Sequence, residues 1–246
     1  MNGILATVDR ELRAYFVSPL AYVILTFMLL INGGVFALII SHLNDPLASG
    51  LSPFELFFGG TFLFWLMLLA IVPILTMRLI AEERRSGTLE SLMTSAVSES
   101  QVVLGKYLAA LAFYTFLWLP TAAYAVIVGR YSTVDWGPVA GGYLGVFLIG
   151  ALFLAIGVFG SSLTKNQIVA ALVTFAILIG LFILIFLDGL LTGSTAKTVL
   201  GHFNVVEHMS EFNKGIVDTR RLVYYLSATF LFLFLATRML AAKKWR

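Results

Sequence analysis

Residues 78–111 form the segment of this chain with the most concentrated polar chemistry. It opens with Arg78, and four consecutive charged residues follow three apolar ones: Glu82, Glu83, Arg84 and Arg85. Gly87 and Thr88 follow, and Gly87 is expected to interrupt the helix that enters the segment. Three apolar residues then recur at i, i+3 and i+4 spacing, with Glu90 on another face: Leu89, Leu92 and Met93. This pattern predicts a bend followed by a short amphipathic helix whose apolar side contacts another protein.

A plainer interpretation of the same segment is a basic juxtamembrane turn that faces lipid, and the alternating charges alone do not argue against it. Ser98 and Gln101 have the spacing of a capping box, so the next helix is expected to begin at Glu99, several residues before its apolar part. That early start would hold the loop away from the membrane.

No sequence motif for covalent chemistry accompanies this segment. The chain has no H-E-x-x-H, no G-x-S-x-G and no G-x-x-x-x-G-K-[ST] pattern. We therefore expect a subunit that is not an enzyme, has no catalytic residues and binds no cofactor of its own. His202, Glu207 and His208 could in principle hold a metal ion. Two histidines six residues apart on a wet amphipathic surface are more typical of solvated polar residues, so no metal is predicted.

The composition indicates that this polar segment belongs to a membrane protein. Hydrophobic residues make up 60% of the 246 residues and charged residues only 12%, with a mean hydropathy of +0.96. There is no cysteine, so neither disulfides nor thiolate metal sites are available. The polar segments are too short for a separate folded domain of about 50 residues, so we treat residues 1–246 as one transmembrane domain.

Six stretches free of charge are candidates for membrane-spanning helices: 20–40, 57–77, 107–128, 139–163, 168–187 and 222–237. Five are long enough to cross about 30 Å of hydrocarbon. The sixth reaches only roughly 24 Å, so it spans only if Arg238 extends its charge to the interface and the helix continues through Ala242. The predicted fold class is an all-α integral membrane protein with six transmembrane helices.

The basic residues divide unevenly when the six spans alternate in direction. One side has eleven: Arg10, Arg13, Arg78, Arg84, Arg85, Lys106, Lys165, Arg238, Lys243, Lys244 and Arg246. The other side has five: Arg130, Lys197, Lys214, Arg220 and Arg221. Because cytoplasmic loops carry the excess of lysine and arginine, both termini are expected in the cytoplasm of a cell with an inner membrane. This distribution also accounts for the positive net charge, so binding to nucleic acid is not needed to explain it.

Two amphipathic segments flank the spans. Apolar residues in 1–18 recur at three- and four-residue spacing up to Pro19, which predicts an interfacial helix or, more plainly, an anchoring flank. Within 188–221 a second apolar face predicts an outer helix or broken helix pair, and it comprises Val199, Phe203, Val206, Met209, Phe212 and Ile216. In the fourth span, Gly141, Gly145 and Gly157 belong to rows of small residues. Such rows favour close helix packing inside the subunit over a subunit interface.

The chain resembles permeases of the type-2 ABC exporter superfamily, most closely those associated with gliding motility or with sodium or copper. The matching residues are EERRSGTLESLMTS at 82–95 and VLGKYLAAL at 103–111, with further agreement in RELRAYFVSPLAYV at 10–23, FGSSLTKNQIVA at 159–170 and the basic C-terminal helix. The resemblance covers nearly the whole chain. It implies a bacterial six-span subunit that forms a homo- or heterodimer, with a separate ATPase beneath each permease.

In such a complex the partner ATPase binds the ATP and magnesium, and residues 82–95 resemble the coupling helix that sits in its groove. The ATPase-coupling residues would be Glu82, Glu83, Arg84, Arg85, Gly87, Thr88, Leu89, Glu90, Leu92 and Met93. Residues 1–18 resemble the connecting helix, and 199–216 the outer re-entrant helices. We expect an ATP-driven exporter that moves its substrate along the dimer interface. The alternatives are a force-transmitting or assembly complex with a periplasmic accessory protein, and an ion-coupled carrier that works alone.

Overall fold

The computed structural model describes residues 2–44, 52–88, 98–190 and 201–242, and every regular element in these ranges is helical. The elements are α1 (Asn2–Val17), α2 (Pro19–Leu43), α3 (Pro53–Phe57), α4 (Phe62–Thr76), α5 (Ala81–Ser86), α7 (Glu99–Trp118), the 3-10 helix η1 (Leu119–Thr121), α8 (Ala122–Tyr131), α9 (Trp136–Leu163), α10 (Gln167–Leu190), α12 (Val205–Asn213) and α13 (Thr219–Ala242).

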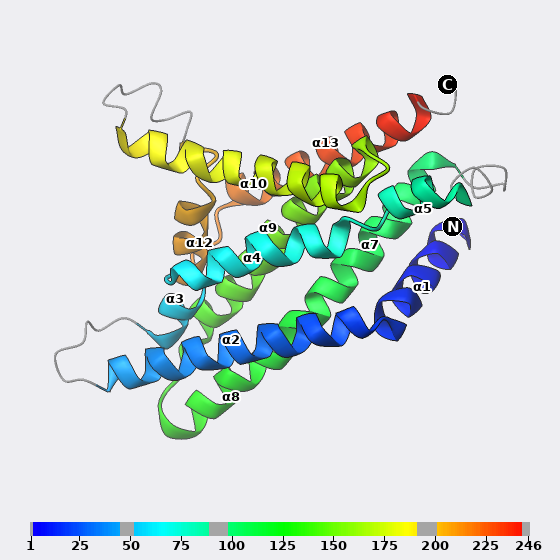
Figure 1. Ribbon diagram of the computed structural model, residues 1–246. Helices are drawn as coiled ribbons and strands as arrows, with labels where there is room; N and C mark the ends of the chain where they lie inside the picture. Colours follow the sequence, from blue (N-terminus) through cyan, green and yellow to red (C-terminus); the bar gives the residue numbers. More distant parts are fainter. Residues whose placement is uncertain (1, 45–51, 89–97, 191–200, 243–246) are drawn as a thin grey trace.

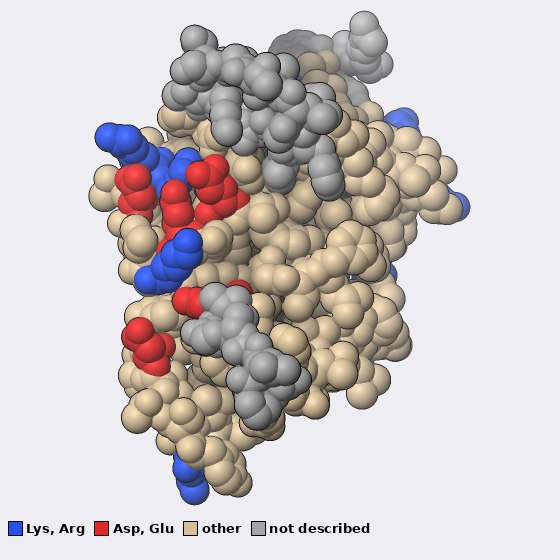
Figure 2. Space-filling view, turned by 90° about the vertical axis from the view of Figure 1, so that its left-hand side faces the viewer, with Lys and Arg blue, Asp and Glu red and all other residues tan. Residues whose placement is uncertain are grey.

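The long helices run between two ends of an elongated bundle (Figure 1). Both termini lie at one end, together with α1, α5 and the start of α7, and we call this the terminal end. The short helices α3 and α12 and the turn after α8 lie at the other, which we call the far end. Figure 2 looks onto the far end, where acidic and basic side chains gather on one side of a mostly uncharged surface.

Five helices in the described part of the chain are long and apolar enough to cross a membrane: Pro19–Leu43, Phe62–Ser86, Glu99–Tyr131, Trp136–Leu163 and Thr219–Ala242. This confirms an all-helical, multi-pass membrane protein. The apolar stretch Gln167–Ile183 of α10 is shorter, so the number of six spans stays a prediction. The last helix does continue through Ala242, as that span requires. The Arg238 guanidinium lies 4.9 Å from the centre of the Phe234 ring, one turn earlier in the helix, in a cation–π contact.

Helix α9 is the centre of the bundle, and most of its residues are buried. Its glycines contact neighbouring helices so closely that an added Cβ would collide with them: at Gly145 with Met209 Sδ of α12, at 2.7 Å, and at Gly157 with Thr76 of α4. A Cβ at Gly141 would collide with the backbone of Phe212. The prediction that these small residues serve packing inside the subunit is therefore confirmed.

The predicted helix starts agree with the structure. Pro19 is the first residue of α2, and its fixed φ and missing N–H suit that position. Helix α7 begins at Glu99, and Ser98 and Gln101 form the capping box, each side chain bonding the other's backbone N–H. Helix α12 is shorter than the predicted amphipathic segment, and Val199 lies outside the described residues.

The prediction that His208 is a solvated surface residue is wrong. Its side chain is fully buried between α12 and α13, where Nδ1 lies 3.0 Å from Tyr225 Oη and Nε2 lies 2.8 Å from Arg221 Nη1. Arg221 in turn forms a bidentate ion pair with Glu211. The apolar periodicity of α12 could not reveal this, because the partners of His208 come from another helix.

Candidate functional site

The short helix α5 is the described part of the polar segment, and its first turn is capped by a residue of another helix. The backbone N–H groups of Ile80 and Ala81 donate hydrogen bonds to Ser161 Oγ of α9 at 3.1 and 3.0 Å. The same hydroxyl donates to the carbonyl of Met77 at 3.2 Å. The first N–H groups of a helix have no partner within the helix, so Ser161 satisfies two of them at a buried position.

A second link joins α5 to the end of α9. Arg84 Nη1 donates a 2.7 Å hydrogen bond to the carbonyl oxygen of Ser162, in the last turn of α9. Carbonyl groups at the end of a helix have no partner in the helix and carry a partial negative charge, so a guanidinium there is favourable. Helix α5 is therefore fixed to α9 at two points.

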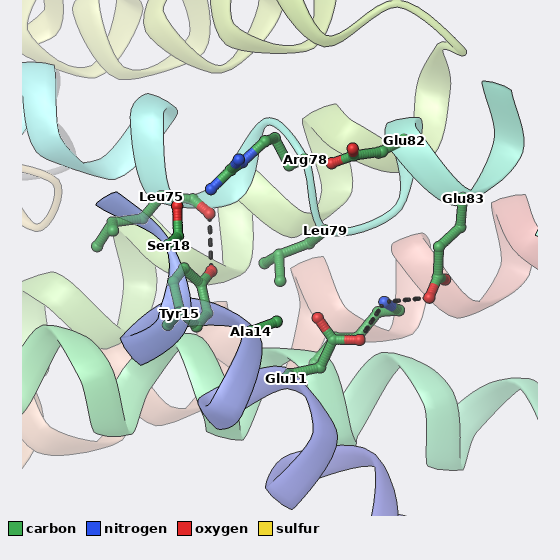
Figure 3. A pocket seen from close by; sticks show the side chains of 10 residues that line it. Glu11, Ala14, Tyr15, Ser18, Leu75, Arg78, Leu79, Glu82 and Glu83 are labelled. Atoms are coloured by element: carbon green, nitrogen blue, oxygen red, sulfur yellow. Dashed lines mark hydrogen bonds and ion pairs between the residues drawn. The ribbon is translucent and has the colours of Figure 1, made fainter. Parts of the chain in front are cut away.

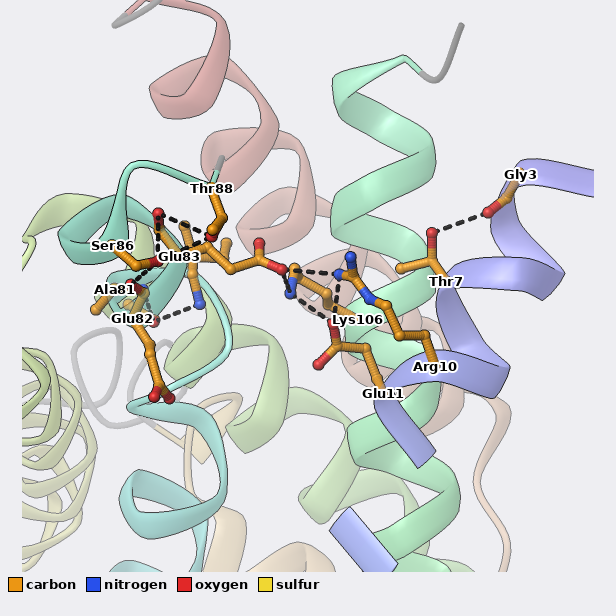
Figure 4. A network of polar contacts seen from close by, with 12 residues as sticks. Gly3, Thr7, Arg10, Glu11, Ala81, Glu82, Glu83, Ser86, Thr88 and Lys106 are labelled. Carbon is orange, nitrogen blue, oxygen red and sulfur yellow. Dashed lines mark hydrogen bonds and ion pairs between the residues drawn. The ribbon is translucent and has the colours of Figure 1, made fainter. Parts of the chain in front are cut away.

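An ion cluster joins α5 to α1 and α7 (Figure 4). Lys106 Nζ of α7 lies 2.8 Å from Glu11 Oε1 of α1 and 2.9 Å from Glu83 Oε1 of α5. Arg10 Nη2 contacts the same two oxygens, at 2.7 and 2.8 Å. The Lys106 side chain is only 1% exposed, and a buried ammonium needs such carboxylate partners.

The charges in this cluster reinforce one another. Burial alone would raise the pKa of Glu11, but the Lys106 ammonium and the Arg10 guanidinium outweigh burial and lower it. Glu11 therefore stays ionised at neutral pH and pairs with the nitrogen of Lys106 beside it. Two cations facing two carboxylates give a compact junction between three helices.

Gly87 bends the chain where α5 ends. Its φ is +73°, in the left-handed region, and a Cβ there would meet no atom within 4 Å. Glycine is therefore favoured here by the left-handed backbone conformation and not by a lack of space for a side chain. Ser86 Oγ and Thr88 Oγ1 are 2.8 Å apart across the bend, and both contact the Glu83 carbonyl. The predicted interruption at Gly87 is confirmed.

The structure brings together part of the predicted coupling set. Glu83, Arg84, Gly87 and Thr88 take part in the links above, while Glu82 and Arg85 are exposed. Leu89, Glu90, Leu92 and Met93 lie outside the described residues, so the predicted apolar contact stays a prediction.

Sequence reasoning missed the contacts that Glu11, Lys106 and Ser161 make with α5 or with its partners. One signal was available for Lys106, which continues the buried face made by Val102, Val103 and Phe113 at helical spacing. A lysine on such a face requires an acidic partner. Nothing in the sequence identified which acid would supply it, because Glu11 and Glu83 come from separate helices.

Together the bundle and its terminal end define a multi-pass helical membrane protein in which a short polar helix is tied by ion pairs and hydrogen bonds to the bundle. The description "ABC-2 family transporter protein" matches residues 44–201, which is more than half of the chain, and the chain belongs to this family. It is thus an ABC permease membrane subunit. A comparison with curated proteins gives no match.

Proposed function

We propose that this permease works in an ATP-driven exporter whose energy comes from a separate ATPase subunit, and that a pair of permeases forms the translocation path. The ATPase would bind ATP and magnesium and contact residues 82–95. Both termini would lie in the cytoplasm, the subunit would sit in the inner membrane, and a periplasmic accessory protein could join the complex.

The anchoring of α5 is the observation that carries this proposal. Ser161 and Arg84 tie α5 to α9, and Glu83 ties it to α1 and α7 through Lys106 and Arg10. A force applied to the loop after Gly87 would therefore be transmitted directly to α1, α7 and α9, because hydrogen bonds and ion pairs hold α5 against these helices. Family membership supplies the second support, since the matched region includes the whole segment.

Reconstitution of the complete complex tests the proposal. The chain and the ATPase encoded beside its gene are purified together and placed in lipid vesicles, and ATP hydrolysis is measured with and without the permease. We expect the ATPase to co-purify stoichiometrically and its turnover to change when the permease is present. Hydrolysis of Mg-ATP by the permease alone, or transport without ATP, would contradict the assignment. An accessory protein without any transported substrate would favour the force-transmitting alternative.

A variant in the loop addresses the coupling contact directly. Leu92→Asp places a charge on the predicted apolar face and should reduce ATPase association by about tenfold or more, because a buried unpaired charge is costly at an interface. Ser132→Asp, at an exposed position in the turn after α8, controls for the added charge. If Leu92→Asp retained normal association and transport, the segment would be an ordinary juxtamembrane turn.

The orientation can be tested separately because the chain contains no cysteine. Lys197→Cys should react with an impermeant thiol reagent from outside the cell, and Lys165→Cys only after the membrane is opened. The opposite labelling pattern would reverse the proposed topology.

A further inference from the structure

A polar cavity of about 320 Å³ lies beside the ion cluster at the terminal end. Figure 3 shows Arg78 and Glu82 reaching over it from the α4–α5 side, opposite Glu11 and Tyr15 of α1. This volume equals roughly ten water molecules at about 30 Å³ each, so a small polar group fits inside.

The cavity contains charges of both signs that the fold does not use. The Arg78 guanidinium and the Glu82 carboxylate make no hydrogen bond or ion pair with any described residue. The neighbouring carboxylate of Glu83 is by contrast already engaged, because its Oε1 pairs with both Lys106 and Arg10. Arg78 and Glu82 are therefore the charged groups of the cavity that a ligand could pair with.

The arrangement of free charges defines what could bind. A ligand with an anionic group could pair with Arg78, since a guanidinium matches phosphate oxygens in bidentate geometry. The same ligand would need a cation with N–H donors for the Glu82 carboxylate. A phosphate joined to a primary ammonium meets both requirements, whereas a simple anion would leave the Glu82 carboxylate unpaired.

The position of the cavity suggests that this ligand is a lipid. Ser18, at the junction of α1 and the apolar helix α2, lines it, and so does Leu75 near the end of α4. A smaller, mainly apolar crevice adjoins it and shares Tyr15, Leu75 and Arg78, with Ile24 and Ile74 deeper between the helices. Polar groups that border directly on apolar helices in this way lie at the depth of lipid head groups.

We propose that the cavity is a binding site for the head group of an amine-bearing phospholipid of the phosphatidylethanolamine type. Arg78 binds the phosphate, and Glu82 accepts hydrogen bonds from the ammonium. The bound lipid fills the space between α1 and α5 and adds a contact between them. This site goes beyond the proposed transport function and does not depend on it.

Native mass spectrometry of the purified full chain in detergent tests the site without the ATPase. The probes are phosphatidylethanolamine, phosphatidylcholine and phosphatidylglycerol with identical acyl chains. We expect phosphatidylethanolamine to bind most tightly, because trimethylation removes the N–H donors and phosphatidylglycerol lacks the cation. Arg78→Gln and Glu82→Gln should each weaken that binding by about tenfold, the effect of losing one charged hydrogen bond.

Arg13→Gln is the matched control, because Arg13 is exposed on α1 and, among the described residues, forms its ion pair with Asp9 alone. It should bind the lipid as the unaltered chain does. Equal binding of the three lipids, tighter binding of phosphatidylglycerol, or unchanged binding in both Arg78→Gln and Glu82→Gln would overturn the proposal. Full competition by water-soluble glycerophosphoethanolamine at the same concentration would overturn the assignment to a lipid. None of these results bears on the ATPase experiments. The lipid site can therefore be disproved without disproving the proposed transport function, and the reverse also holds.

Discussion

Lys106 of α7 and Glu83 of α5 form a 2.9 Å ion pair, and this pair joins the segment that enters the polar loop to a helix that runs into the bundle. Glu11 of α1 shares the same ammonium at 2.8 Å. Three helices that are separate in the sequence therefore meet at one buried nitrogen atom.

Lys106→Met removes that nitrogen and leaves two carboxylates with only Arg10 between them. We expect the free energy of unfolding to fall by about 3–5 kcal/mol, the usual cost of removing one partner of a buried ion pair. Thermal unfolding in detergent measures the loss. Lys165→Met, which removes an exposed lysine, should change it little. The double variant Glu11→Gln with Lys106→Met should recover part of the loss, and strictly additive effects would argue against the cluster.

The sequence predicted this fold well where the signal is local. The apolar stretches, the capping box at Ser98 and the bend at Gly87 all depend on residues close together in the chain. The links of the site depend on residues from different helices, such as Ser161 with Ile80 and Lys106 with Glu11. Helical periodicity says which face is buried but not which helix covers it, so these links could not be predicted.

Gly87→Val tests whether the bend directs the loop. A β-branched residue at a φ of +73° is strained, and the left-handed conformation costs an L-residue roughly 1–2 kcal/mol even though the space around Gly87 is open. We expect normal membrane insertion but reduced stimulation of the ATPase in the reconstituted complex. Gly34→Ala, also in open space but inside helix α2, is the control. Equal stimulation by both variants would mean that the bend has no role in coupling.

His208 should make the far end sensitive to acid. Arg221 can only donate, so Nε2 of His208 accepts its hydrogen bond and Nδ1 donates to Tyr225 Oη. Burial first, and then the positive charge of Arg221, lower the pKa of His208 to about 4, although Glu211 acts in the opposite direction. The neutral imidazole is thus the form that the folded state requires.

A lowered histidine pKa fixes the direction of the effect on stability. Above the ordinary pKa of 6.5 the imidazole is neutral in both folded and unfolded chains. As the pH falls towards about 4, only the unfolded chain takes up the proton, so the free energy of unfolding decreases by up to about 3 kcal/mol. Unfolding temperatures measured from pH 8 to 4 should show this slope. In His208→Gln the slope should be smaller, and an identical slope would assign the effect to other groups.

Ser161→Ala tests the anchoring of α5 to α9. The substitution leaves the buried N–H groups of Ile80 and Ala81 without their acceptor, and each unsatisfied group costs about 1–3 kcal/mol. The start of α5 should then open more often, which hydrogen exchange at residues 80 and 81 would detect as a loss of protection. Ser227→Ala is the control, because Ser227 is exposed and its hydroxyl donates to the carbonyl of Tyr224 in its own helix. If force on the loop is transmitted through α5, Ser161→Ala should also reduce the change in ATP hydrolysis that the permease causes. Binding of the ATPase should remain normal. Loss of protection with fully retained stimulation would show that the force reaches the bundle by another route, through Lys106 and the cluster around it.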